Sequence, residues 1–142
     1  MNLENISTRF DSFLNQHWKL SNITPFMRAY VQLLLLFADE LSAVELNVVN
    51  ERKKQLRGEE FDNKDFDALR LSSRQTMAQD DKENTITRRA MLNKLLFCAL
   101  VDTEETDLFY LTEPMFEFMR EMKVRPNEAI KILESEFISF KV

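Results

Sequence analysis

Apolar residues recur along this chain mostly every three or four positions, which is the spacing of one face of an α-helix. The first stripe covers 3–17 and ends at a polar break. Thr24 and Pro25 then give a helix start signal, because threonine can cap free amide groups and proline suits the first helical position. The pattern therefore predicts one helix over 3–17 and another that begins near Pro25.

The second stripe continues from Phe26 to Val48, which predicts a single long helix. Between Tyr30 and Ala38 almost every residue is apolar, so this half should be surrounded by other elements. Basic residues follow over 52–57, where cations face the negative end of the helix dipole, and Gly58 is the predicted stop. We expect this helix to be the centre of the fold.

The middle of the chain alternates between helical and polar patterns. Phe61 and Phe66 flank Asp62 as in a capped helix start, which predicts a short helix to about Leu71. The following stretch, 72–84, is polar and is predicted to be a mobile loop. A further helix is expected from Thr85 to Phe97, capped by residue 84 or 85.

The last third contains the only signals for β-structure. Two short β-prone runs, 99–101 and 108–111, flank an acidic turn and predict a small hairpin. Thr112 to Pro114 should restart a helix, and Pro126 should end that helix and open the last one. The fold class is therefore mainly α, with about six helices around one long central helix and one short β-hairpin. Residues 1–142 should form a single domain, because the second half alone would bury little surface.

Composition supports a folded, helical chain. Of 142 residues only one is glycine and three are proline, which leaves few positions for tight left-handed turns or phosphate-binding glycine loops. The chain is 44% hydrophobic and 30% charged, outside the range of disordered sequences. Its net charge of −5 favours solubility and weakens attraction to nucleic acid or anionic lipid.

No catalytic, metal-binding or cofactor-binding residues are predicted. The single histidine, His17, and the single cysteine, Cys98, lie far apart in sequence, so a metal centre of several histidines is excluded by count. The densest acidic run, 102–107, lacks the glycine that an EF-hand loop needs. The sequence therefore favours a protein without enzymatic activity.

The surroundings of Cys98 and the N-terminus indicate a cytoplasmic protein. Cys98 lies in an apolar run and has no cysteine to pair with, as in a reducing compartment. The first residues lack the basic start and apolar run of a signal peptide, and the stretch from Tyr30 to Ala38 is too short to span a membrane.

These observations predict that the chain binds another protein. It would be a small acidic regulator, an assembly subunit, or an inhibitor of the immunity or antitoxin type that occludes a basic toxin or nuclease. Residues two apart on a helix point away from each other, so one of the two phenylalanines at 116 and 118 should be exposed or meet another element. Self-association is left open. The residues predicted to contact the partner are Glu104, Glu105, Asp107, Phe116, Glu117, Phe118 and Glu121.

A second reading comes from the segment 85–122, which contains TITRRAMLNKLL, an apolar run, an acidic turn, LFYLT and a further helix. This order resembles the recognition helix, wing and following helix of winged helix-turn-helix proteins. The resemblance implies a DNA-binding protein or transcriptional regulator that faces the major groove, with arginine contacts to phosphates and base edges. The matching residues are Thr87, Arg88, Arg89, Asn93 and Lys94. Because the wing is acidic, a winged-helix shape with a protein-binding surface fits the sequence better.

Overall fold

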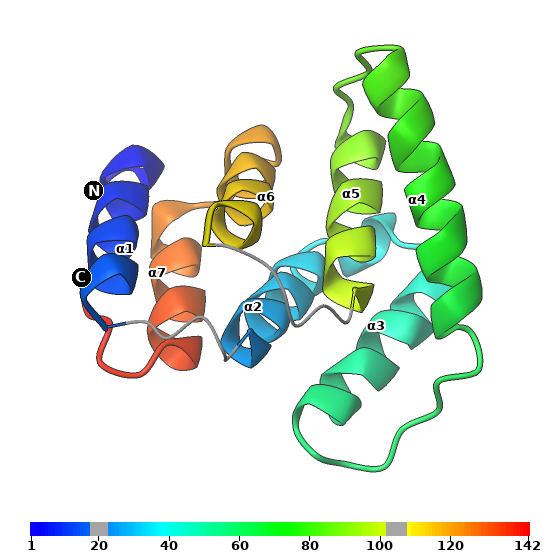
Figure 1. The fold of residues 1–142 in the computed structure, drawn as a ribbon, viewed down its shortest axis with the longest axis horizontal. Helices are drawn as coiled ribbons and strands as arrows, with labels where there is room; N and C mark the ends of the chain where they lie inside the picture. The colour runs from blue at the N-terminus through cyan, green and yellow to red at the C-terminus, as the bar shows by residue number, and fades with distance from the viewer. Residues whose placement is uncertain (18–22, 102–107) are drawn as a thin grey trace.

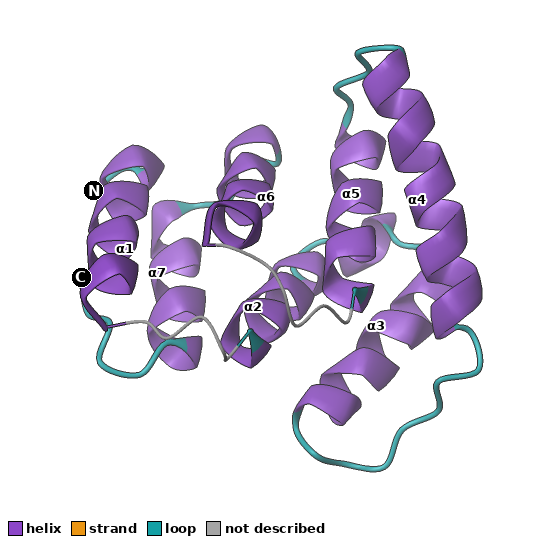
Figure 2. Cartoon of the chain, in the orientation of Figure 1, coloured by secondary structure: helices purple, strands orange, loops and turns teal. Residues whose placement is uncertain are grey.

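Helices are the regular secondary structure of the part that the computed structural model describes, which is residues 1–17, 23–101 and 108–142, and loops join them (Figures 1 and 2). Those residues contain seven α-helices and one short 3-10 helix, and no strand. The elements are α1 (Leu3–His17), α2 (Thr24–Leu35), η1 (Ala38–Glu40), α3 (Ala43–Leu56), α4 (Phe66–Lys82), α5 (Arg88–Leu100), α6 (Leu108–Glu121) and α7 (Pro126–Glu136). The mainly α class is confirmed.

Helix α2 lies at the centre of the molecule. It contacts α3, α5, α6 and α7, with α1, α6 and α7 toward one end of the view and α3, α4 and α5 toward the other (Figure 1). Seven of its twelve residues are buried, which is what its apolar sequence predicts. One continuous hydrophobic core runs from α1 through α2 to α5, α6 and α7.

The prediction of one long helix from Phe26 to Val48 is wrong, because the helix is interrupted between α2 and α3. The Ser42 hydroxyl accepts a hydrogen bond from the Glu45 amide at 3.1 Å, and the Glu45 carboxylate accepts one from the Ser42 amide at 2.8 Å. This reciprocal pair is a capping box, which starts a new helix at residue 43. The break turns the chain and places Glu40 and Glu45 beside α5.

The predicted mobile loop over 72–84 is also wrong, because α4 continues to Lys82. This helix packs along α5, and only a narrow inward stripe that includes Leu69, Ser73 and Met77 is shielded from solvent. The Asn93 side-chain amide, buried in α5, donates a hydrogen bond to the Ser73 carbonyl at 2.9 Å. A helix that packs on one side only needs few apolar residues. The polar sequence of 72–84 therefore lacks the apolar periodicity by which a helix is predicted.

The predicted hairpin is not formed in the described residues. Ala99 and Leu100 end α5, and 108–111 begin α6, while the expected turn at 102–107 lies outside the described residues. A short apolar run fits a buried helix end as well as a strand, and both Ala99 and Leu100 are buried here. The winged-helix arrangement therefore lacks support, since its wing is built from strands.

Helix α6 begins before the predicted start at Thr112 and contains Pro114 in its interior. Proline has no amide hydrogen to donate to the carbonyl one turn earlier. Close to this point the buried Tyr30 hydroxyl donates a hydrogen bond to the Leu111 carbonyl. Tyr30 thereby ties α2 to α6.

The two phenylalanines of α6 point to different neighbours. The Phe116 ring lies 5.9 Å from Phe10 of α1, and the Phe118 ring lies 5.6 Å from Phe37, measured between centroids. Both rings are buried. Of the two predicted outcomes, exposure or contact with another element, the second is found, and it holds for both rings.

Arginine side chains from neighbouring helices bind the last carbonyls of α3 and α5. Arg28 donates two hydrogen bonds to the Leu56 carbonyl, at 3.1 and 2.8 Å. Arg52 is only 4% exposed and donates from Nε to the Ala99 carbonyl at 3.0 Å. The last carbonyls of a helix have no partner within the helix and carry its negative end, so a cation is well placed there.

We expect the substitution Arg52→Ala to lower the free energy of unfolding by about 2–3 kcal/mol, because it leaves a buried carbonyl without its charged donor. Urea unfolding followed by circular dichroism measures the change. The control Arg57→Ala removes an exposed arginine from the same helix end and should cost less than about 0.5 kcal/mol. Equal stability of the two variants would contradict the role of Arg52.

Candidate functional site

The two arginines of the predicted recognition helix are held by carboxylates of the fold. Arg88 donates from Nε and Nη2 to the two carboxylate oxygens of Glu40, at 3.0 and 2.6 Å, and its guanidinium lies 5.5 Å from the centroid of the Phe37 ring. Arg89 contacts both carboxylate oxygens of Glu45, one of them at 3.0 Å. Two arginines at the positive end of the α5 dipole are unfavourable for the helix. The paired carboxylates supply negative charge there and offset this effect.

The other three residues of that predicted interface also have partners within the chain. The Thr87 hydroxyl caps α5 by accepting from the Ala90 amide at 3.0 Å. Asn93 is buried against α4, as described above. Lys94 donates to the Glu117 carboxylate of α6, at 3.1 and 3.3 Å. Arg88, Arg89, Asn93 and Lys94 therefore connect elements of the fold, Thr87 caps its own helix, and the five residues do not form one free basic face.

Local contacts set the charge of these groups. Burial raises the pKa of Glu45, but hydrogen bonds from Arg89 and Ser42 outweigh it, and the net pKa is lowered. For Lys94 the directions are reversed, because burial lowers the pKa of an amine. The hydrogen bond to Glu117 and the attraction of Asp81 outweigh burial, and the net pKa of Lys94 is raised. Both side chains therefore stay ionised near neutral pH.

Four of the seven residues predicted to bind a protein partner lie in the described part of the chain. Phe116 and Phe118 are buried, so that part of the prediction is wrong, and they act in the core. Glu117 is paired with Lys94, and Glu121 is exposed. The remaining predicted residues, Glu104, Glu105 and Asp107, lie outside the described residues.

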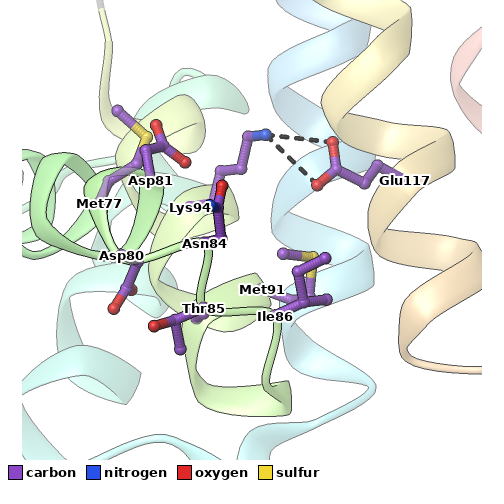
Figure 3. Close-up of a pocket in the computed structure, with 10 residues that line it drawn as sticks. Met77, Asp80, Asp81, Asn84, Thr85, Ile86, Met91, Lys94 and Glu117 are labelled. Carbon is purple, nitrogen blue, oxygen red and sulfur yellow. Dashed lines mark hydrogen bonds and ion pairs between the residues drawn. The ribbon is translucent and has the colours of Figure 1, made fainter.

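A different surface combines apolar and charged side chains. It is a pocket of about 220 Å³, here named the α4–α5 groove, between the end of α4, the start of α5 and the facing side of α6 (Figure 3). Ile86 at its edge is 71% exposed. Its lining includes the apolar residues Met77, Ile86 and Met91 and the charged residues Asp80, Asp81, Lys94 and Glu117.

The turn between α4 and α5 shapes this groove. Asn84 adopts the left-handed conformation with φ +52°, the Thr85 amide donates to the Asp80 carbonyl at 2.9 Å, and the Asn84 amide donates to the Asp81 carbonyl at 3.3 Å. This is the Schellman pattern of a helix end, with asparagine in the position that glycine usually takes. The chain then runs to the Thr87 cap and leaves Ile86 on the surface between them.

Two sequence signals could have located the helix boundaries around the start of α5, namely the start of α3 and the end of α4. The segment S-A-V-E at 42–45 has the spacing of a capping box, and Asn84 before Thr85 and Thr87 suits a helix end followed by a new cap. Ile86 is the one apolar residue in that polar turn. Its exposure could not be read from the sequence without the correct helix boundaries.

The remaining chemistry of the described residues is limited. Burial raises the pKa of Cys98 to about 11, so the thiol stays protonated near neutral pH. Among the residues that the structure describes, no three histidine, cysteine or acidic side chains gather as a metal site. No helix in that same part of the chain has the length and apolar character needed to cross a membrane.

Comparisons with protein-family models, with curated proteins and with solved structures find no match to this chain.

The Glu45–Arg89 pair makes stability depend on pH. A carboxylate whose pKa is lowered by folding stabilises the protein above its unfolded pKa, about 4.3, and that contribution is lost as the pH falls through the lower folded pKa. We expect Glu45→Gln to lower the free energy of unfolding by about 1–2 kcal/mol at pH 7. This deficit should shrink below pH 4.3, measured by urea unfolding at several pH values. A deficit that stays constant down to pH 3 would contradict the assignment.

Proposed function

We propose that this protein is a protein-binding module that acts by docking, as a small acidic regulator, inhibitor or assembly subunit. The observation that carries the proposal is the α4–α5 groove, where an exposed isoleucine and two methionines lie among carboxylates. Exposed apolar residues with a polar rim are typical of contact surfaces. Methionine side chains are flexible and polarisable, so Met77 and Met91 suit a surface that adapts to a partner.

Charge supports a basic partner. The chain carries a net charge of −5, and three of the four charged residues of the groove are acidic. Complementary charge accelerates the encounter of two proteins and selects among partners. Inhibition of a basic toxin or nuclease by occlusion is one concrete form of this function.

The proposal can be tested by placing a photo-crosslinking amino acid at Ile86 in the native host, with Val44 as the matched control. Val44 is also an exposed apolar residue, at 56%, but it lies at the start of α3. We expect a defined protein adduct from position 86 and none from position 44. Once the partner is purified, Ile86→Asp should weaken its binding about tenfold or more, while Val44→Asp should not. Equal labelling at both positions, or unchanged affinity of Ile86→Asp, would contradict docking at the groove.

The alternative is a winged-helix DNA-binding protein. The internal contacts of Arg88, Arg89 and Lys94 favour protein binding over it, because a phosphate would have to compete with a carboxylate for each cation. We expect no measurable affinity for duplex DNA at low salt. Binding that weakens steeply with rising salt, measured by fluorescence anisotropy, would favour the alternative, since phosphate contacts release counterions.

A further inference from the structure

We infer that the α4–α5 groove receives one cationic side chain, arginine or lysine, from a partner segment that also presents apolar residues beside it. The inference rests on the proposed protein-binding function and specifies the chemistry of the partner. In this arrangement the aliphatic stem lies on Met77 and Met91, and the charged head lies in the negative field of Asp80 and Asp81, whose carboxylates point in different directions from the end of α4 (Figure 3). Ile86 would pack against the neighbouring apolar residues of the partner.

The size of the groove favours a side chain over a small-molecule ligand. Its volume of about 220 Å³ is below the roughly 300–1,000 Å³ that is usual for sites of drug-sized ligands or cofactors. Its edge is formed by the exposed Ile86. A segment of a larger partner can insert one residue and cover this isoleucine at the same time.

The charge of the groove favours a cation over an anion. Glu117 and Lys94 are paired across it, as Figure 3 shows, so their charges offset each other. Asp80 and Asp81 remain in excess: Asp81 attracts Lys94 from a distance, and in the described part of the chain neither carboxylate takes part in an ion pair. An arginine or lysine head would supply the missing positive charge.

The position of the two aspartates is a second argument. They lie in the last turn of α4, where the helix dipole is negative and acidic residues destabilise the helix; Lys82 beside them is the favourable choice. A local choice that opposes folding is commonly found at a functional position. Binding of a cation explains two aspartates at this position, whereas helix stability does not.

The methionines of the groove provide an apolar surface for the stem of the cationic side chain. Long cationic side chains bury their aliphatic stems against apolar surfaces while the head stays polar. Met91 is buried and Met77 half-buried, so both form the inner wall. A purely acidic surface would attract a cation without orienting it, whereas this groove provides a place for the stem as well.

The test uses methionine-methyl NMR of the whole protein, which contains seven methionines. The probe is the tripeptide acetyl-Leu-Arg-Leu-amide, and the neutral comparison is the same peptide with citrulline in place of arginine. We expect saturable shifts of the Met77 and Met91 methyl signals with the arginine peptide. The citrulline peptide should bind about tenfold more weakly, since it lacks the charge but keeps the shape.

Two double variants make the test specific. Asp80→Asn with Asp81→Asn should abolish the preference for arginine over citrulline without loss of folding, because it removes negative charge from a helix C-terminus. Glu59→Gln with Glu60→Gln makes the same change of charge in the exposed α3–α4 connection and should leave the preference intact.

The outcomes separate this inference from the proposed function. Equal affinity for the two peptides, or a preference that survives in the aspartate variant, would overturn the cationic occupant. If crosslinking at Ile86 persists in that case, the docking surface stands with a different partner chemistry. If the methyl signals do not move and crosslinking also fails, both proposals are wrong.

Discussion

The constraint on which this fold depends is the enclosure of α5, whose two ends are bound by side chains of neighbouring elements. Eight of its thirteen residues are buried, and α2, α4 and α6 pack around it. At its C-terminal end the Ala99 carbonyl is bound by the buried Arg52. At its N-terminal end the half-exposed Arg88 and Arg89 pair with the carboxylates of Glu40 and Glu45. A buried polar group without a partner is costly, so the buried Arg52 and Asn93 fix the places of α3 and α4 against α5.

This constraint also determines which side chains remain for function. The break between α2 and α3 brings Glu40 and Glu45 to the arginines, and Asn93 holds α4 against α5. The cations that would read DNA in a winged helix are thereby engaged in the fold. What is left at the α4–α5 end is an apolar edge with two aspartates, the surface on which we base the proposed protein contact.

The sequence predicted the elements whose signals are local and failed where packing decides. The helix over 3–17, the stop at Gly58 with φ +75° and the start at Pro126 follow from periodicity, left-handed backbone and proline chemistry. Helix α4 was missed because a polar helix needs only one narrow apolar stripe. The hairpin was predicted because short apolar runs suit strands and buried helix ends alike. The groove depends on the juxtaposition of α4, α5 and α6, which no single segment encodes.

Native-state hydrogen exchange tests the central place of α5 most directly, because it reports the opening free energy of each helix in the intact protein. The account predicts that amides from Leu92 to Leu100 exchange only through global unfolding, with the highest protection in the molecule, while those of the outer helix α4 exchange at a lower free energy. Amides of α5 that open locally, at a lower free energy than those of α4, would contradict it.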